Sequence, residues 1–398
     1  MKKDDQSRSR DHAQTDEARD HAQTDESRDH AQTDEARDHA QQGEVRSEAE
    51  IGGAGDGAQI GEARKMVEIG RTGLMVSRLG LGGAPLAGLY QGVSDEQAAR
   101  VVNTYLDHGP GFIDTAPLYG SGVSETRLGA VLSERVRNAR VSCDGRGSFV
   151  LATKVGRLLV PDPAREQDVW SEDLPPVGPV FDYSYDGTLR SLDESLTRLG
   201  LDKVDILHIH DPDNHYDEAM KGSYRALVRM RDEGVIGAVG VGMNQAKMLA
   251  RFAVEGDFDC FLCAGRYTLV DHTALKRLLP LCEERKISLI IGGPYNSGIL
   301  AQGAVEGAKF DYRKAPPGIV ERVRRVEAVC GRHGTSLKAA ALQFPLAHPA
   351  VAAVIPGARS PEEVDENVAM AEFETPADFW AELRQEGLIP DEAPTPGE

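Results

Sequence analysis

Four side chains that could hold or transfer a proton stand at or just beyond the ends of short apolar runs. Asp114 ends "GFID" and Tyr119 follows five residues later, while Lys154 ends "FVLATK" and His210 ends "VDILHIH". A free Tyr has a pKa near 10, and a nearby ammonium lowers it, so we expect Lys154 to bring the pKa of Tyr119 toward the neutral range. We expect Asp114 to keep Lys154 charged and neutral His210 to orient a carbonyl oxygen.

Each of these residues also has an ordinary alternative. An acid at a strand end often caps a turn, Lys154 alone could be a surface charge, and Tyr119 beside Gly120 could pack in a turn. His208 stands two residues before His210, and we expect only one of the two to face the interior, without being able to say which. Because all four residues follow successive runs, the pattern favours a shared site.

The elements that must position these residues alternate along the chain. Apolar runs typical of buried strands are expected at 78–83, 111–114, 149–154, 204–210, 237–242, 258–264, 288–293 and 351–357. Helical runs are expected at 94–109, 124–136, 184–200, 216–234, 244–256, 272–286, 318–334 and 361–372, with Ser94 and Ser124 as N-caps. Eight strands, each followed by a helix, predict an α/β fold, a (β/α)8 TIM barrel with an N-terminal β-hairpin turning at 71–73.

One connection is much longer than the others. Residues 155–183 follow the strand that ends in Lys154, are rich in Pro, and contain Trp170 and Tyr183. Loops at the carboxyl ends of barrel strands surround the active site, so we expect this segment to cover the substrate, with Trp170 and Tyr183 in contact with it.

The chain divides into three predicted parts. Residues 1–65 contain a nine-residue repeat, "RDHAQTDEA", and a Gly-rich linker, and they are predicted to be a disordered tail because the repeat has no large apolar side chain. Residues 66–372 form the barrel, with Met66 as a candidate start, and residues 373–398 form a C-terminal helix and tail that pack on it. The regularly spaced histidines of the tail are better explained as solvated side chains than as metal ligands; they are His12, His21, His30 and His39.

Composition excludes several classes of protein. The net charge of −19 argues against nucleic acid or an anionic membrane as a partner, and no apolar run is long enough to span a membrane. The polar N-terminus lacks a secretory h-region, and five scattered cysteines fit a reducing compartment, so a cytoplasmic location is expected. Cys260 and Cys263 form a C-x-x-C within a strand-like run, where positions three apart face opposite sides, so no metal site is expected.

These motifs together resemble a known family. "GFIDTAPLYGSGVSETRLG" is similar to the signature of the aldo-keto reductases, and "FVLATKVG", "DILHIHDPD", "GVGMN" and "VIPGARSPEEVDEN" follow in that family's order across residues 66–372. The resemblance implies a catalytic tetrad of Asp114, Tyr119, Lys154 and His210, which selects His210 over His208. It also implies NAD or NADP bound across the barrel mouth without a Gly-x-Gly-x-x-Gly loop.

The resemblance further assigns cofactor contacts. Asn244 corresponds to the nicotinamide-amide ligand, Tyr267 to the stacking ring, and "PYNSG" to the pyrophosphate wrap; the implied contacts are Asn244, Tyr267, Pro294, Asn296, Ser297, Gly298, Gly357, Arg359, Glu366 and Asn367. Many members carry Lys and Arg where this chain has Gly357 and Glu363. Since Glu363 would repel a 2′-phosphate, NAD is favoured over NADP, although Arg359 could compensate.

Other stretches resemble a branch that contains D-threo-aldose (L-fucose) 1-dehydrogenases, L-galactose dehydrogenase and pyridoxal 4-dehydrogenase. The branch implies oxidation of an aldose of the L-fucose or L-galactose type to its lactone by a monomer or small homo-oligomer, with Tyr119 and His210 touching the substrate. Pyridoxal 4-dehydrogenase, a generalist aldehyde reductase and a nucleotide-binding regulatory subunit, like the potassium-channel β subunits, remain alternatives.

Overall fold

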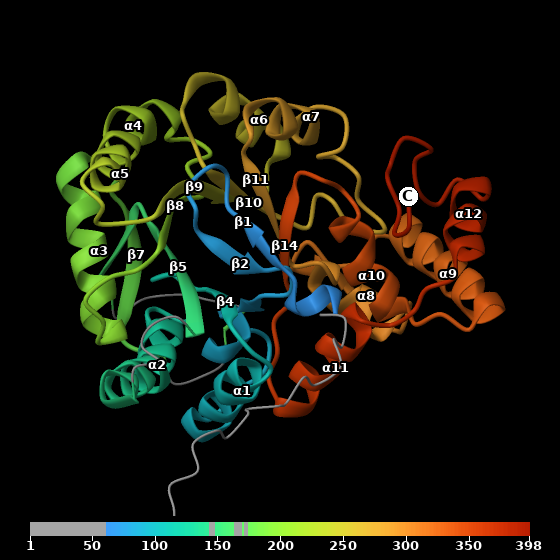
Figure 1. Ribbon diagram of the computed structural model, residues 1–398, viewed down its shortest axis with the longest axis horizontal. Helices are drawn as coiled ribbons and strands as arrows, with labels where there is room; N and C mark the ends of the chain where they lie inside the picture. The colour runs from blue at the N-terminus through green and yellow to red at the C-terminus, as the bar shows by residue number, and fades with distance from the viewer. Residues whose placement is uncertain (1–60, 143–147, 163–168, 171–173) are drawn as a thin grey trace, which may run out of the picture. The chain divides into compact units, whose positions relative to one another are not determined.

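Eight parallel strands form the centre of the fold (Figure 1). In the computed structural model the described residues are 61–142, 148–162, 169–170 and 174–398, all within the unit Ala58–Glu398. The strands are β3 (Leu81–Gly82), β4 (Gly111–Asp114), β5 (Phe149–Val155), β8 (Ile206–His210), β9 (Ala238–Met243), β10 (Cys260–Ala264), β11 (Ser288–Gly292) and β14 (Val351–Ile355). They pair in this order, and parallel bridges from Leu79 to Val354 and from Gly82 to Gly357 join β3 to β14.

Helices surround this ring, which confirms the predicted (β/α)8 barrel (Figure 1). They are α1 (Asp95–Asp107), α2 (Val123–Ser142), α3 (Tyr185–Leu199), α4 (Tyr216–Lys221), α5 (Ser223–Asp232), α6 (Ala246–Glu255), α7 (Leu278–Arg285), α8 (Ile299–Gln302), α9 (Pro317–His333), α10 (Leu337–Leu346), α11 (Pro361–Ala371) and α12 (Ala377–Gln385). Ser94 caps α1 as expected, because its hydroxyl accepts from the Gln97 N–H at 3.2 Å.

Side chains at alternate strand positions belong to two separate hydrophobic cores. Phe112, Ile206 and Cys260 belong to the cluster inside the barrel, whereas Cys263 belongs to the larger cluster between the strands and the helices. Cys260 and Cys263 therefore face opposite sides of β10, as their spacing predicts. Both thiols are buried and free.

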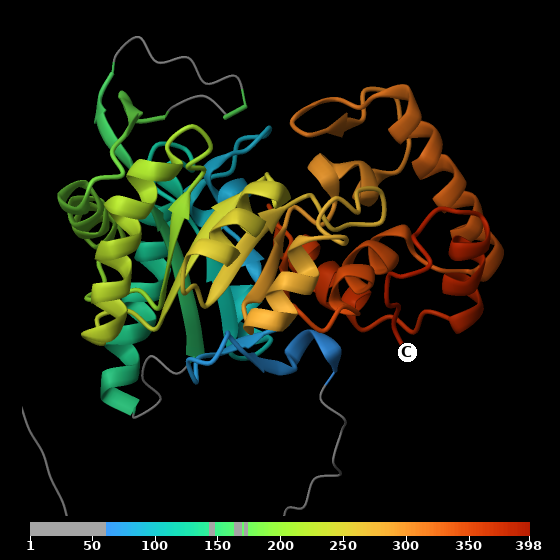
Figure 2. The ribbon, with the colours of Figure 1, turned by 90° about the horizontal axis from the view of Figure 1, so that it is seen from above.

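The predicted N-terminal β-hairpin is present, and it covers the amino-terminal end of the barrel. Strands β1 (Met66–Glu68) and β2 (Met75–Ser77) pair antiparallel, and the Gly70 N–H donates to Ser288 Oγ at 2.8 Å, at the start of β11. Figure 2 shows this hairpin on the opposite side of the barrel from the β12–β13 hairpin (Lys309–Phe310 and Arg313–Lys314). The carboxyl ends of the strands are thus left open to the loops.

The described part of the chain includes residues before Met66, the predicted start of the barrel. The 3-10 helix η1 (Glu62–Arg64) buries Ala63, and Glu62 pairs with Arg78 at 2.9 Å between Oε1 and Nε. These contacts place the last residues of the expected tail on the barrel. The repeat and its histidines, as well as Cys143, lie outside the described residues.

Several predicted helices have different limits in the structure. The single helix expected at 216–234 is broken into α4 and α5 at Gly222, and the helix expected at 272–286 begins only at Leu278. The apolar segment α10 was not predicted, because it lacks polar alternation. Ser124 is not a cap: it lies inside α2, and its hydroxyl donates to the Gly83 carbonyl at 2.9 Å.

The C-terminal segment carries α12, and its aromatic side chains lie inside the protein. Phe379 and Trp380 are almost fully buried, and α12 packs against α9. The last helix therefore covers the outer layer of helices rather than the barrel strands.

The break at Gly222 has a steric cause that can be tested. A Cβ at Gly222 would lie 2.1 Å from the Tyr183 carbonyl oxygen, whereas a Cβ at Gly331, in the exposed face of α9, would meet nothing within 4 Å. We expect Gly222→Ala to lower the free energy of unfolding by about 1–3 kcal/mol through overpacking. The control Gly331→Ala should instead raise it by about 0.5–1 kcal/mol, and urea denaturation distinguishes the two. Equal stability of both variants would contradict the steric explanation.

Candidate active site

Asp114, Tyr119, Lys154 and His210 lie together at the carboxyl ends of β4, β5 and β8. Lys154 Nζ donates to Asp114 Oδ2 at 2.7 Å, to the Thr115 carbonyl at 2.8 Å and to the Tyr119 hydroxyl at 3.0 Å. The side chains of Lys154 and Asp114 are only 1% and 2% exposed, while Tyr119 keeps part of its surface open. The ring of His210 stands edge-on to that of Tyr119, with centroids 6.0 Å apart.

Strand register brings these residues together. Lys154 pairs with His208 across β5 and β8, and His208 pairs with Gly240 across β8 and β9, so these three positions form one row inside the barrel. The alternating glycines of β9 make room for the larger side chains. A Cβ at Gly240 would lie 2.3 Å from the His208 ring, and one at Gly242 would lie 3.3 Å from Lys154 Cε.

The expectation that only one of His208 and His210 faces the interior is wrong. Residues two apart in a strand share a face, so both rings point inward, with His208 below His210. His208 is fully buried, and neither of its ring nitrogens has a partner among the described residues. Burial, followed by the charge of Lys154, lowers the pKa of His208 to about 3.

The expected downward shift of the Tyr119 pKa is also not observed. Burial is the largest influence and, with the carboxylates of Asp114 and Asp211, it raises the pKa of Tyr119 well above its ordinary value; Arg157 acts in the opposite direction. Lys154 does not offset this effect because Asp114 already neutralises its charge at 2.7 Å. Tyr119 is therefore held as the neutral phenol.

Sequence reasoning did not single out a second charged pair next to His210. Arg157 Nη2 lies 2.8 Å from Asp211 Oδ2, and the same carboxylate oxygen lies 3.5 Å from His210 Nε2. The sequence did contain a signal for this pair, because Arg157 in "TKVGR" and Asp211 in "HIHD" carry opposite charges just beyond the ends of two neighbouring strands. Burial, followed by the charges of Arg157 and Lys154, holds the pKa of His210 well below its usual range.

The long segment after β5 supplies the expected aromatic residues, but in two different positions. The ring of Trp170 lies 6.1 Å from that of Tyr119, beside the open part of the site. Tyr183 is instead buried, and its hydroxyl donates to the carbonyls of His210 and Asp211 at 2.6 and 2.9 Å. In this arrangement Tyr183 supports the end of β8 and does not face a substrate.

A cavity of about 380 Å³ contains most of the residues expected to hold a dinucleotide. Of the expected residues, those that line it are Pro294, Asn296, Ser297, Gly298, Gly357, Arg359, Glu366 and Asn367. Asn296 is 3% exposed, and its Oδ1 has no partner among the described residues, so a buried polar acceptor is available there. A nucleotide fits this set because backbone glycines and polar side chains alternate along one groove.

The two remaining cofactor predictions fall outside this cavity. Asn244 follows β9, and its carbonyl accepts from Arg266 Nε at 2.8 Å. Tyr267 is fully buried against Phe344 and His348, with ring centroids 5.1 and 5.7 Å away. The expected stacking surface is thus covered by protein side chains in this structure.

Glu363 also lines the cavity and already engages the nearest arginine. Its Oε2 accepts from the Arg359 backbone N–H at 2.8 Å, and its Oε1 lies 3.4 Å from the Arg359 guanidinium. Lys338 is similarly paired with Glu366 at 2.5 Å. Both Arg359 and Lys338 are therefore neutralised by carboxylates.

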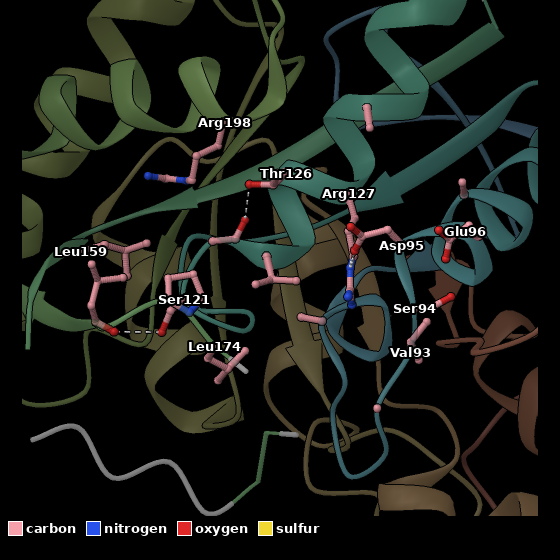
Figure 3. A pocket seen from close by; sticks show the side chains of 18 of the residues that line it. Val93, Ser94, Asp95, Glu96, Ser121, Thr126, Arg127, Leu159, Leu174 and Arg198 are labelled. Atoms are coloured by element: carbon pink, nitrogen blue, oxygen red, sulfur yellow. Dashed lines mark hydrogen bonds and ion pairs between the residues drawn. The ribbon is translucent and has the colours of Figure 1, made fainter. Parts of the chain in front are cut away.

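A second cavity has a volume of about 1360 Å³ (Figure 3). Figure 3 shows Ser94 and Asp95 from the start of α1, Thr126 from the start of α2, Leu159 from β6 (Arg157–Pro161) and Arg198 from α3 around it. No tetrad side chain lines it. It meets the smaller cavity at a shared wall residue, Tyr90.

Within the described ranges, no cluster of three or more His, Cys, Asp or Glu could hold a metal ion. The described helices likewise include none with the length and apolar character needed to cross a membrane. A Tyr–Lys–Asp cluster with a neutral His at the open end of a parallel barrel defines a class of enzymes that move a proton at a carbonyl or hydroxyl oxygen.

Comparison with known proteins agrees with this class. A sequence model of the Aldo/keto reductase family matches residues 78–386. Pyridoxal 4-dehydrogenase from Microbacterium luteolum is 40% identical over 345 residues, covering 80% of this chain and 96% of that protein. D-threo-aldose 1-dehydrogenase from Pseudomonas sp. is 37% identical over 325 residues, covering 80% and 96%. A solved aldo-keto reductase from Bacillus halodurans, in its holo form, has a TM-score of 0.62 at 25% identity, covering 82% of this chain and 96% of its own.

The chain belongs to the aldo/keto reductase family. It is an NAD(P)-dependent oxidoreductase, and the predicted family and enzyme class are confirmed. The substrate is a small molecule with a carbonyl group or the corresponding alcohol.

The buried His208 gives a prediction for acid stability. Its folded pKa of about 3 lies below the ordinary value of 6.5, so the unfolded chain binds one more proton between these limits and the free energy of unfolding decreases as pH falls through this window. The uptake of one proton on unfolding changes the free energy of unfolding by about 1.4 kcal/mol per pH unit. We expect His208→Leu to reduce the pH dependence of the free energy of unfolding by this amount. Urea denaturation between pH 6.5 and 4 measures it. An identical slope in the variant and the parent protein would contradict the assignment.

Proposed function

We propose that this protein oxidises the cyclic hemiacetal form of an aldose, of the L-fucose or L-galactose type, to its lactone, and that it prefers NAD. The observation that supports the chemistry is the hydrogen bond of 3.0 Å from Lys154 Nζ to the Tyr119 hydroxyl, beside a carboxylate 2.7 Å from the same nitrogen. The sugar substrate is supported by the similarity to D-threo-aldose 1-dehydrogenase over 96% of that protein.

Lys154 sets the direction of the Tyr119 proton. An ammonium has three N–H donors, and those of Lys154 are used by Asp114, Thr115 and Tyr119. Since the Tyr119 oxygen accepts one of them, its own O–H is free to point toward the open side of the site. A substrate oxygen placed there can exchange a proton with Tyr119, while the Lys154 N–H stays hydrogen-bonded to the Tyr119 oxygen and holds it in position.

His210 supplies the second contact to the same oxygen. Its pKa lies well below the usual range, so the ring stays neutral and one nitrogen can donate a hydrogen bond without carrying charge. In the oxidative direction Tyr119 first releases its own proton to solvent on the open side of the site, and the phenolate then takes the proton of the C1 hydroxyl while the C1–O bond becomes the lactone carbonyl. NAD or NADP, if held in the cavity lined by Asn296 and Asn367, would supply the hydride acceptor for the hydrogen on C1. In the proposed site Trp170 flanks the sugar ring, 6.1 Å from the Tyr119 ring.

Pyridoxal is the second candidate substrate. It is supported by the relative named pyridoxal 4-dehydrogenase, which is 40% identical to this chain. Its cyclic hemiacetal presents the same hydroxyl and hydrogen on one carbon, so the same proton transfer applies. The aromatic side chains around the site, Trp170 and the pair Tyr90–Tyr312 with centroids 6.5 Å apart, offer surfaces on which a pyridine ring could stack.

A substrate panel tests the proposal directly. L-fucose, L-galactose, D-arabinose and pyridoxal are each assayed with NAD and with NADP by the absorbance of the reduced nicotinamide. The proposal expects the highest kcat/KM for an aldose with NAD and a lactone as product. Turnover of pyridoxal alone would replace the aldose with the second candidate, and no oxidation of any hemiacetal would refute both.

Replacing the proposed proton donor should separate chemistry from binding. We expect Tyr119→Phe to reduce kcat by about 10²–10⁴-fold, since it removes only proton transfer, while the Kd for the dinucleotide stays within about twofold. Tyr185→Phe is a matched control, because among the described residues its hydroxyl accepts from Arg229 Nη1, at 3.1 Å and in an exposed position. Parental kcat in the Tyr119 variant would exclude the proposed mechanism.

The acidic end of the nucleotide cavity should control the choice of cofactor. We expect Glu363→Arg to raise the ratio of kcat/KM with NADP to that with NAD at least about tenfold, because it removes a carboxylate and frees Arg359 for a phosphate. Glu362→Gln, in the same turn of α11 but outside the cavity lining, is the control. An unchanged ratio in the Glu363 variant would show that another group governs the preference.

A further inference from the structure

A carboxylate lies beside His210, the residue that the proposed function uses as a neutral hydrogen-bond donor. Asp211 Oδ2 is 3.5 Å from His210 Nε2. An isolated carboxylate at this distance favours the charged imidazolium. The structure therefore contains a group that opposes the neutral state of His210.

Arg157 lies on the other side of the same carboxylate oxygen. Its Nη2 is 2.8 Å from Asp211 Oδ2, and its side chain is only 15% exposed. Arg157 also stacks over Phe181 of β7 (Val177–Phe181), with its guanidinium carbon 5.1 Å from the ring centroid. The guanidinium is thus fixed where it neutralises Asp211.

The backbone of Asp211 is held in an unfavourable conformation to reach this position. Its φ is +42°, in the left-handed region that non-glycine residues rarely adopt. Three contacts hold it there: its N–H donates to the Gly242 carbonyl at 2.9 Å, and the Tyr183 hydroxyl donates to the His210 and Asp211 carbonyls. Strain that is maintained by several neighbours is typical of functional positions.

We propose that Arg157 and Asp211 act as a positioning pair for His210. Asp211 favours the tautomer whose proton is on Nε2, and Arg157 balances the charge of Asp211 so that the His210–Asp211 pair does not bind a second proton. Neutral His210 is then ready to donate Nε2–H to the substrate oxygen. The inference rests on the proposed function only for the role of that donor; the protonation of His210 is a property of this chain alone.

The other charged and titratable groups around His210 do not replace Arg157. Lys154 from β5 is already paired with Asp114, and His208 from β8 is itself neutral because its pKa is about 3. Tyr119, from the loop after β4, has its pKa raised well above the ordinary value by burial, so it is uncharged. Tyr183, before α3, is uncharged for the same reason.

Two further groups act on the pair from neighbouring loops. Asp213, from the loop after β8, acts on Asp211 and raises its pKa, together with burial. Tyr312, from the turn between β12 and β13, is about half exposed, and it is uncharged at neutral pH because an ordinary Tyr has a pKa near 10. Among the described groups that face the pair, Arg157 is therefore the cation left to balance Asp211.

The test measures the protonation of His210 directly. The full-length protein is labelled with ¹⁵N-histidine, and the His210 signals are assigned by their loss in His210→Gln. The pH titration and tautomer of His210 are followed by NMR in the parent, in Arg157→Gln, in Asp211→Asn and in the double variant. The pH dependence of kcat/KM is measured on the same proteins with the substrate found in the panel.

In Arg157→Gln we expect the His210–Asp211 pair to bind a proton at least about one pH unit higher than in the parent, because its carboxylate is no longer balanced. The acid limb of kcat/KM should move up by the same amount. In the double variant both the titration and the acid limb should return toward the parental position. Asp211→Asn alone should lose the preference for the Nε2–H tautomer and lower kcat at all pH values.

Controls separate this role from a structural one. Arg231→Gln removes an arginine of similar exposure, 19%, that pairs with Asp259 at the opposite end of the barrel, and it should leave the His210 titration unchanged. Arg157→Lys keeps the charge and should titrate like the parent. If Arg157→Gln does not fold, Asp211→Asn and Arg157→Lys still test the pair, since a raised His210 pKa in Asp211→Asn contradicts it.

An unmoved His210 titration in folded Arg157→Gln would overturn the proposal, as would a loss of activity that is equal at all pH values with no change in protonation. The NMR titration needs no turnover. A raised titration midpoint in a protein that oxidises none of the panel substrates would therefore support the positioning pair while refuting the proposed function.

Discussion

The buried ion pair between Lys154 and Asp114 is the interaction on which the site depends. Placing two charges in an interior where their side chains are 1% and 2% exposed is costly, and their attraction offsets the cost only if the remaining hydrogen-bond capacity is also used. Lys154 meets this condition with Thr115 and Tyr119 as its other acceptors, whereas Asp114 Oδ1 is buried without a partner among the described residues. The Tyr119 hydroxyl thus helps to stabilise the buried charge of Lys154, in addition to being the proposed proton donor.

This constraint extends into the barrel. The long side chain of Lys154 and the ring of His208 need space between strands, which β9 provides by placing Gly240 and Gly242 at inward positions. The charge balance around His210 follows the same logic, since Arg157 and Asp211 are each acceptable in a partly buried position only because they pair at 2.8 Å. The glycines that leave space for large side chains and the ion pairs that balance buried charges therefore occur at neighbouring positions of paired strands.

Much of the fold was predictable because its signals are local. The eight apolar runs each became a barrel strand, and Ser94 capped its helix as expected, since strand length and capping depend on neighbouring residues. The errors came from contacts distant in sequence. Gly222 breaks a helix because the Tyr183 carbonyl approaches it, and α10 was missed because burial on several sides removes the polar alternation of an exposed helix.

For the site, the sequence by itself determined which residues could do the chemistry: an acid, a lysine and a histidine at the ends of successive strands, with a tyrosine shortly after the first. Only the tertiary structure decided how they behave. It showed that His208 and His210 share the inward face, that Asp114 cancels the charge of Lys154, and that Arg157 meets Asp211 beside His210. The physical reason is that a pKa depends on burial and on charges brought close in space, and neither can be read from positions along the chain.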